Sequence, residues 1–194
     1  MREEIIKALE EFKTICLTKE DNNKFLSIES YLCKLNNGKT IKREKILKNN
    51  KDGSAVVVYP ITEDGKIILA IEPRVFTART VGVGLPAGYI EEGEEPIEAA
   101  RRELREETGY ASDYLIHMGA FYQDQGCSAA FNHYFLALNC KKVGEQKLDP
   151  SEYIKYVLVD NNELTELLEN GYITGLNSAY LIEKGKNYVR RRML

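Results

Sequence analysis

Two short apolar runs separated by a turn set the strongest limit on how this chain can fold. Residues 54–61 read SAVVVYPI, residues 66–72 read KIILAIE, and residues 62–65 between them have the composition of a hairpin turn. Because apolar and polar residues do not alternate, both faces of these strands are expected to be buried. The main core is therefore predicted to begin here. The polar residues 48–53 are predicted to separate an N-terminal module, residues 1–50, from a main domain, residues 51–194.

The N-terminal module is predicted to contain a helix and a hairpin. Residues 1–14 have helical periodicity and place four apolar side chains on one stripe: Ile5, Ile6, Leu9 and Phe12. A polar loop is expected at residues 18–23. Residues 25–48 then alternate around an NNGK turn, which predicts a β-hairpin. A hairpin of this size is not stable alone, so it must pack on the rest of the chain or on a second copy.

The C-terminal half has the pattern of three strands followed by two helices. The strands are predicted at residues 114–122, 130–139 and 153–159. Asn161 or Asn162 is expected to cap a helix that ends near Leu168, and a last helix is expected at residues 176–188.

Composition excludes several classes of protein. The net charge of -3 gives no general attraction for nucleic acid, and residues 190–192, three arginines, are expected to be a solvated helix end. The 4 cysteines form no Cys-x-x-Cys pair, which predicts reduced thiols rather than disulfides or structural zinc. No apolar run approaches the roughly 20 residues that span a bilayer. A cytoplasmic protein without a membrane partner is therefore predicted.

Residues 88–110 concentrate glutamate, with 8 of the 23 residues. Pro96 fits the first turn of a helix and Thr108-Gly109 its end, which predicts about thirteen helical residues. Ile97, Ala100 and Leu104 are expected to form its buried stripe.

Three carboxylates share another face of that predicted helix: Glu103, Glu106 and Glu107. Like charges at this spacing repel one another. A hard divalent cation converts the repulsion into attraction, since Mg²⁺ and Mn²⁺ prefer oxygen ligands. The spacing alone supports a metal site and an exposed acidic helix face about equally.

The surrounding pattern resembles the signature of the Nudix hydrolases. That signature is Gly, five residues, Glu, seven residues, then Arg-Glu-apolar-x-Glu-Glu-x-Gly-apolar. The matching residues are Gly88, Glu94, Arg102, Glu103, Leu104, Glu106, Glu107 and Gly109. Tyr110 departs from it, because the family usually has an aliphatic residue there. A match at eight positions in the expected order is far more specific than a short glycine motif.

The resemblance implies an α/β/α sandwich with a mixed sheet and the hydrolysis of a diphosphate linked to another moiety. It implies that Glu103, Glu106 and Glu107 bind Mg²⁺ or Mn²⁺, that Arg102 orients these glutamates, and that Gly88 and Glu94 shape the loop.

The residues around the signature resemble the branch that cleaves ADP-ribose and other nucleoside diphosphate sugars. In that branch the carbonyl of Ala87 is a metal ligand and Arg74 contacts the diphosphate, with Glu94 also on the substrate side. Gly84 and Gln125 replace a glutamate and a proline that are common there. A GDP-sugar, another ADP-sugar or a sugar phosphate therefore remains an alternative to ADP-ribose.

The branch also suggests a catalytic base on a loop after the signature and an exchanged N-terminal module. Glu152 is the first candidate base and Asp149 the second, with Glu106 as the base if that loop is an ordinary turn. A homodimer is predicted. The alternative to the dimer is a hairpin that packs on its own domain. The alternatives to the function are a Nudix domain that binds its ligand without turnover and a nucleoside triphosphate pyrophosphatase.

The histidines and aromatic residues are given structural roles. His117 and His133 are expected to be structural, and three aromatic residues are expected in the core rather than against a nucleobase: Tyr122, Phe131 and Phe135.

Overall fold

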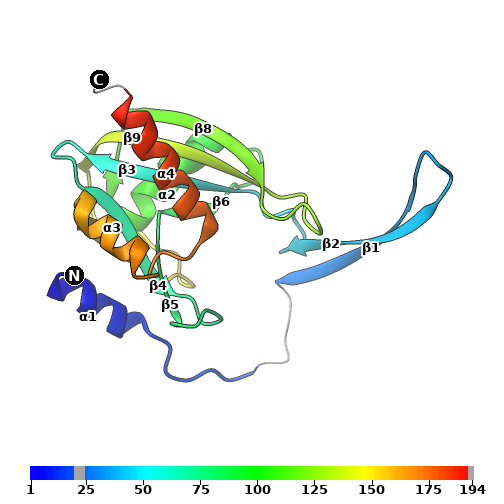
Figure 1. Cartoon of the computed structure of the whole chain (residues 1–194), viewed down its shortest axis with the longest axis horizontal. Coiled ribbons are helices and arrows are strands. Elements are labelled where there is room, and N and C mark those ends of the chain that lie inside the picture. The colour runs from blue at the N-terminus through cyan, green and yellow to red at the C-terminus, as the bar shows by residue number, and fades with distance from the viewer. Residues whose placement is uncertain (20–24, 192–194) are drawn as a thin grey trace.

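The computed structural model describes residues 1–19 and 25–191 (Figure 1). The loop predicted at residues 18–23 lies mostly outside the described residues, as does Arg192. The chain forms a globular body from which a long hairpin extends (Figure 1). The two helices that were predicted near the C-terminus belong to this body.

A mixed eight-stranded sheet forms the centre of the body, with strand order β10-β4-β3-β9-β7. Strand β5 pairs with β4, β6 with β3, and β8 with β9. Only β3 and β9 run parallel among these pairs in the described chain. The bounds of the strands are β3 Ala55–Thr62, β4 Ile67–Pro73, β5 Val81–Gly84, β6 Ala87–Tyr89, β7 Tyr110–Ala111, β8 Tyr114–Tyr122, β9 Phe131–Lys142 and β10 Lys155–Val159.

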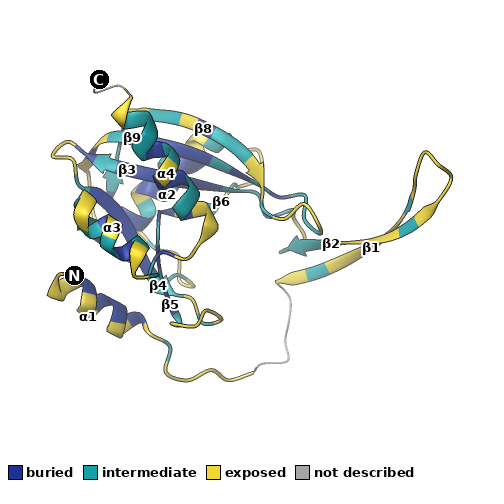
Figure 2. Cartoon of the chain, viewed as in Figure 1, coloured by how far each residue is buried: buried dark blue, intermediate teal, exposed yellow. Residues whose placement is uncertain are grey.

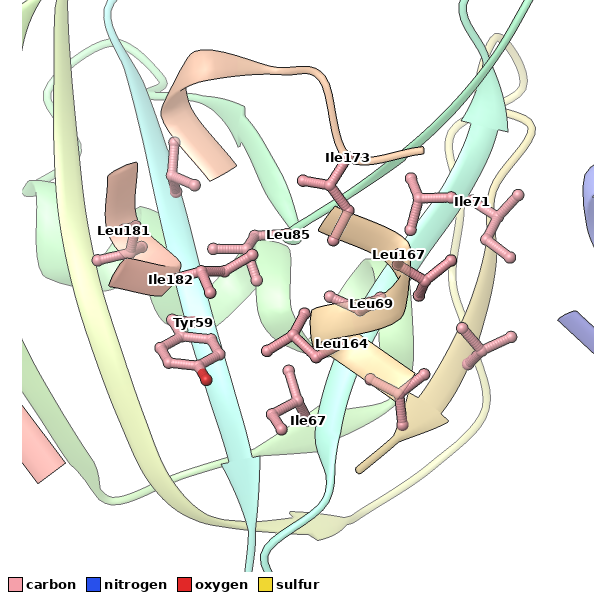
Figure 3. Packing of buried hydrophobic residues seen from close by; sticks show 14 of the residues in the cluster. Tyr59, Ile67, Leu69, Ile71, Leu85, Leu164, Leu167, Ile173, Leu181 and Ile182 are labelled. Carbon is pink, nitrogen blue, oxygen red and sulfur yellow. The ribbon is translucent and has the colours of Figure 1, made fainter. Parts of the chain in front are cut away.

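Helices cover both faces of the sheet. Alternate residues of β3 point to opposite sides and pack against the two helical layers. Val56 and Val58 pack in the same cluster as Leu104 of α2 (Pro96–Thr108). Val57 and Tyr59 face the opposite layer, which contains α1 (Glu3–Phe12), α3 (Asn161–Glu169) and α4 (Leu176–Arg190). Figure 3 shows Tyr59 and Leu69 of the sheet packed with Leu164 of α3 and Leu181 of α4. The predicted α/β/α sandwich is confirmed.

Most predicted elements are confirmed, but some residues within them are placed differently. Ile97 is 37% exposed and Ile6 is 47% exposed, so neither belongs to the buried stripe of its helix. Ala99 and Ala8 are buried instead. The N-cap of α3 is Asp160, which makes a capping box with Glu163, rather than either asparagine.

The N-terminal hairpin forms a sheet of its own, β1 (Leu26–Lys34) with β2 (Thr40–Lys48). Its strands are largely exposed and its turn lies far from the body (Figure 2). Near its base, the Ile46 amide donates to the carbonyl of Cys127 at 2.8 Å. Helix α1 packs on the main core, away from this hairpin, with Ile5 fully buried. The division of the chain at residue 50 stays a prediction.

None of the 4 cysteines, all of which lie in the described residues, is paired in a disulfide. Among the residues that the structure describes, no helix has the length and apolar character that crossing a membrane requires.

Candidate active site

Arg102, on α2, holds the acidic residues of the signature together. Its Nε and Nη2 donate to the two carboxylate oxygens of Glu94, each at 2.9 Å, which is a bidentate pair. Its Nη1 donates to Glu103 Oε1 at 2.6 Å and to Glu106 Oε2 at 3.2 Å. Nη2 also donates to the carbonyl of Tyr89 at 2.9 Å. One guanidinium therefore fixes the loop, the helix and strand β6 relative to one another.

Strand β6 approaches α2 so closely that Gly88 has no room for a side chain. A Cβ on Gly88 would lie 2.1 Å from the carboxyl carbon of Glu103. The strand next contacts Glu107, whose Oε2 accepts a hydrogen bond from the Ala87 amide at 3.1 Å. The signature glycine and the alanine before it thus bring the backbone against two glutamates.

A cavity of about 570 Å³ opens beside these glutamates. Glu103 and Glu107 line it from α2, Glu72 and Arg74 from the end of β4, and Glu152 from the loop before β10. The Arg74 guanidinium is paired with Glu72. The structure therefore brings five predicted site residues to one cavity with Ala87, Gly88 and the second candidate base, Asp149: Arg74, Arg102, Glu103, Glu107 and Glu152. Glu94 and Glu106 are not among the residues that line it.

Burial and hydrogen bonding shift the pKa values of these carboxylates. Glu107 is 4% exposed, and its burial, reinforced by the charges of Glu103 and Glu72, raises its pKa well above the ordinary value. Burial also raises the pKa of Glu103, although Arg102 opposes the shift. The two hydrogen bonds that Arg102 donates to Glu94 lower the pKa of Glu94.

These residues have the chemistry of a site for a hard divalent cation. Glu72, Glu103, Glu107 and Glu152 act electrostatically on one another, so buried negative charge is concentrated at this end of the cavity. Within residues 1–19 and 25–191, however, no three His, Cys, Asp or Glu side chains converge closely enough to hold a metal ion. Arg102 engages Glu103 and Glu106, and the Ala87 amide engages Glu107.

Several residues of the cavity were not identified from the sequence. Glu72 stands at a strand end next to Arg74, a position that could have indicated it. Four others come from distant parts of the chain and carry no local pattern: Lys48, Gln123, Asn132 and Asn177.

The predicted structural roles are confirmed for only part of the aromatic set. Phe135 is 2% exposed and belongs to the core, but Tyr122 is 47% exposed, so the prediction for Tyr122 is wrong. Its ring lies 4.1 Å from that of Phe131, between ring centroids. The two histidines face one another across β8 and β9 with centroids 6.0 Å apart, outside the cavity.

The layered fold and the glutamate-bearing helix define a class of protein, the NUDIX domain, whose family pattern matches residues 51–175. The chain belongs to this family, and the predicted Nudix pyrophosphohydrolase class is confirmed. Nudix hydrolases generally require a divalent metal ion.

Three similar proteins refine this assignment. The chain is 36% identical to the ADP-ribose pyrophosphatase of Bacillus subtilis (strain 168) over 92% of the chain and 94% of the relative. It is 31% identical to the methanol dehydrogenase activator of Bacillus methanolicus over 70% of the chain and 71% of that protein. A crystal structure of an ADP compounds hydrolase has the same fold, with TM-score 0.75, 21% identity and coverage of 92% and 94%.

Proposed function

We propose that this protein hydrolyses the diphosphate bond of a nucleoside diphosphate sugar, with ADP-ribose as the leading substrate. The products are a nucleoside monophosphate and a sugar phosphate. The observation that carries the proposal is the cavity in which two buried glutamates of α2, Glu103 and Glu107, lie together with Arg74. The similarity to an ADP-ribose pyrophosphatase over 92% of the chain supports the choice of substrate.

Glu103, Glu106 and Glu107, with the carbonyl of Ala87, are the residues that would hold the cation, Mg²⁺ or Mn²⁺. When bound, the cation neutralises charge on the phosphoryl oxygens and lowers the pKa of water. Without a cation, Arg102 neutralises part of the negative charge of Glu103 and Glu106 and keeps these two carboxylates close together. Gly88 leaves space for Glu103, and Gly109, with φ of 72°, ends the helix directly after Thr108.

In this proposal, Arg74 and Glu152 act on the substrate itself. The Arg74 guanidinium lines the cavity and is more than half exposed, so it is free to exchange Glu72 for a diphosphate oxygen. Glu152 lines the same cavity from a loop, where its carboxylate accepts a hydrogen bond from the Asp149 amide at 2.9 Å. We assign Glu152 as the general base that takes a proton from the attacking water. Glu94 supports the substrate side indirectly, through Arg102.

The test is hydrolysis of ADP-ribose, ADP- and GDP-sugars, dinucleotides and nucleoside triphosphates with Mg²⁺ and then Mn²⁺, with products identified by mass. We expect one diphosphate sugar to be cleaved, and Glu107→Gln to reduce kcat by about a hundredfold or more. The matched control is Glu98→Gln on the exposed side of α2, which should leave kcat unchanged. Faster cleavage of triphosphates than of diphosphate sugars would contradict the proposal.

A binding protein without turnover is the second candidate, because one similar protein is named as the activator of another enzyme and not as a hydrolase. This function predicts that wild type and Glu107→Gln bind ADP-ribose equally and that neither releases product. Calorimetric titration beside the hydrolysis assay separates the two functions.

We also propose that the protein is a cytoplasmic homodimer in which the β1–β2 hairpin contacts a second subunit. Ile28 and Leu32, four residues apart on β1, are 66% and 79% exposed, and exposed apolar side chains close together on one element are typical of an interaction surface. Light scattering should give twice the mass of one chain, and Ile28→Ser with Leu32→Ser should halve it. A monomeric wild type would instead favour a hairpin that serves its own domain.

A further inference from the structure

One buried polar group at the cavity has no partner. Asn132 is 2% exposed and lines the cavity from β9. Its Nδ2 is the one buried side-chain nitrogen or oxygen, among the residues that the structure describes, that makes no hydrogen bond. A buried donor of this kind costs free energy unless something pairs with it.

A chain of hydrogen bonds fixes the direction of the Asn132 amide. Lys48 Nζ donates to Gln123 Oε1 at 2.7 Å, and Gln123 Nε2 donates to the carbonyl of Gly53 and to Asn132 Oδ1, each at 2.8 Å. Because Gln123 uses its N–H groups and occupies Oδ1 of Asn132, the unused group of Asn132 is a donor. The cavity next to Asn132 therefore presents an unpaired N–H donor, which a ligand atom that accepts a hydrogen bond can pair with.

The next residue on the same face of β9 does not satisfy this donor. Tyr134 donates its hydroxyl to Asn177 Oδ1 at 2.8 Å. Burial raises the pKa of Tyr134, and the Asn132 amide close to its hydroxyl partly offsets that rise, but Nδ2 makes no hydrogen bond of normal length and angle to that hydroxyl.

The position of Asn132 relative to the glutamates suits one part of a nucleotide. Ala55 of β3 pairs with Tyr89 on one side and with Asn132 on the other. Two strand spacings, about 10 Å, therefore separate Asn132 from β6, where Gly88 meets Glu103. The ribose of a nucleotide together with its base is long enough to cover this gap when the phosphates lie at the glutamates.

An aromatic ring from β6 lines the same cavity, and Lys48 contacts both this ring and Gln123. Tyr89 lines the cavity and is 47% exposed, with Lys48 Nζ 5.8 Å from its ring centroid. An exposed ring beside amide donors is the usual combination for binding a flat heteroaromatic group.

From these contacts we infer that Asn132 is a specificity residue that donates a hydrogen bond to an acceptor atom of the nucleobase. The inference rests on the proposed function for the identity of the ligand. It assigns the end of the cavity at Asn132 and Gln123 to the base and the end at Glu103 and Glu107 to the phosphates.

The test is calorimetric binding of ADP-ribose, AMP and ribose 5-phosphate without metal, to wild type and to Asn132→Leu. The neutral leucine has a similar volume but no N–H group. We expect the Kd of ADP-ribose and of AMP to rise about tenfold or more, and that of ribose 5-phosphate to stay unchanged. Asn132→Ala provides the same comparison if the leucine variant does not fold, and Asn161→Ala, exposed on α3, is the control.

Three results would overturn the inference: an unchanged Kd for AMP and ADP-ribose, an equal loss for ribose 5-phosphate, or no binding of AMP and ADP-ribose by wild type. Hydrolysis of ADP-ribose by wild type with Mg²⁺ is measured separately. Hydrolysis with an Asn132-independent Kd rejects the inference alone, and an Asn132-dependent Kd without hydrolysis rejects the proposed function alone.

Discussion

Gly88 is the residue at which sequence, packing and chemistry are most directly connected. It is required here for close approach, since any side chain would occupy the space of the Glu103 carboxylate. The backbone of β6 therefore lies directly against two buried carboxylates. A side chain at this position would move the strand away from them. A glycine motif that looks like a turn signal in the sequence therefore serves as a packing contact.

We expect Gly88→Ala to move the Glu103 carboxylate and to lower kcat by about 100-fold, because small displacements of catalytic groups have effects of that size. Circular dichroism and steady-state kinetics measure the fold and the rate. Gly144→Ala is the matched control, since a Cβ there meets nothing within 4 Å. Equal rates for wild type and Gly88→Ala would show that Glu103 is not needed in this position.

His133 gives a pH-dependent prediction away from the cavity. Burial lowers its pKa, and the neighbouring His117 lowers it further. Neutral His133 therefore stabilises the folded state above the unfolded pKa of about 6.5, and this contribution is lost as the pH falls through the lower folded pKa. We expect His117→Gln to raise the pKa of His133 in an NMR titration. A pKa that stays the same or falls would assign the whole shift to burial.

At the scale of elements, helix α2 could be predicted almost completely, because its start, its end and its charged face are all local patterns. Pro96 and Gly109 bound the helix as expected. The short strands β5, β6 and β7 could not be predicted, since two to four residues carry too little periodicity. The exposure of Ile97 was also not predictable, because it depends on which neighbours the sheet provides.

The candidate site divides in the same way. Residues of the signature were predicted from their spacing, and Glu152 from the resemblance to a branch whose base lies on a loop after the signature. Lys48 and Asn132 were not identified, because only the folded chain brings the end of β2 and the start of β9 to the same cavity. Their side chains have no sequence neighbours that indicate a shared function.

Tyr110, which departs from the family pattern, belongs to a contact at the end of α2. Its ring lies 5.8 Å from that of Tyr156, and Lys142 Nζ lies 5.4 Å and 4.6 Å from the two ring centroids. Lys142 also donates to the carbonyl of Thr108 at 3.1 Å. The lysine thus provides positive charge at the helix C-terminus, where the helix dipole favours it.

We expect Lys142→Met to lower the free energy of unfolding by about 1 kcal/mol, through the lost helix-end charge and cation–π contacts. Urea unfolding followed by circular dichroism measures the change. Lys141→Met, which removes only a surface ion pair with Glu63, should change stability by less than about 0.5 kcal/mol. A similar effect of both substitutions would mean that the aromatic contact contributes nothing.

At the scale of the whole molecule, the N-terminal residues contribute to two different places. Helix α1 completes the layer of α3 and α4, whereas the hairpin brings Lys48 to the cavity. The matched family region, residues 51–175, is therefore smaller than the unit that packs together.

Removal of residues 1–14 should lower the free energy of unfolding by about 3 kcal/mol or more, because three large buried side chains are lost: Ile5, Leu9 and Phe12. The urea midpoint measures this loss. Ile6→Ser, at a position that is 47% exposed, is the control and should have little effect. An unchanged midpoint after the deletion would mean that α1 is not part of the stable core.

The cavity collects residues from Lys48 to Asn177, across most of the chain. Such distant segments meet late in folding, because each contact requires the closure of a long loop. A partly folded chain can hold α2 and its glutamates and still lack the walls around them. During refolding, enzymatic activity should therefore return with the rate of the slowest structural phase. The recovery of activity then measures when the last segments of the fold have come together.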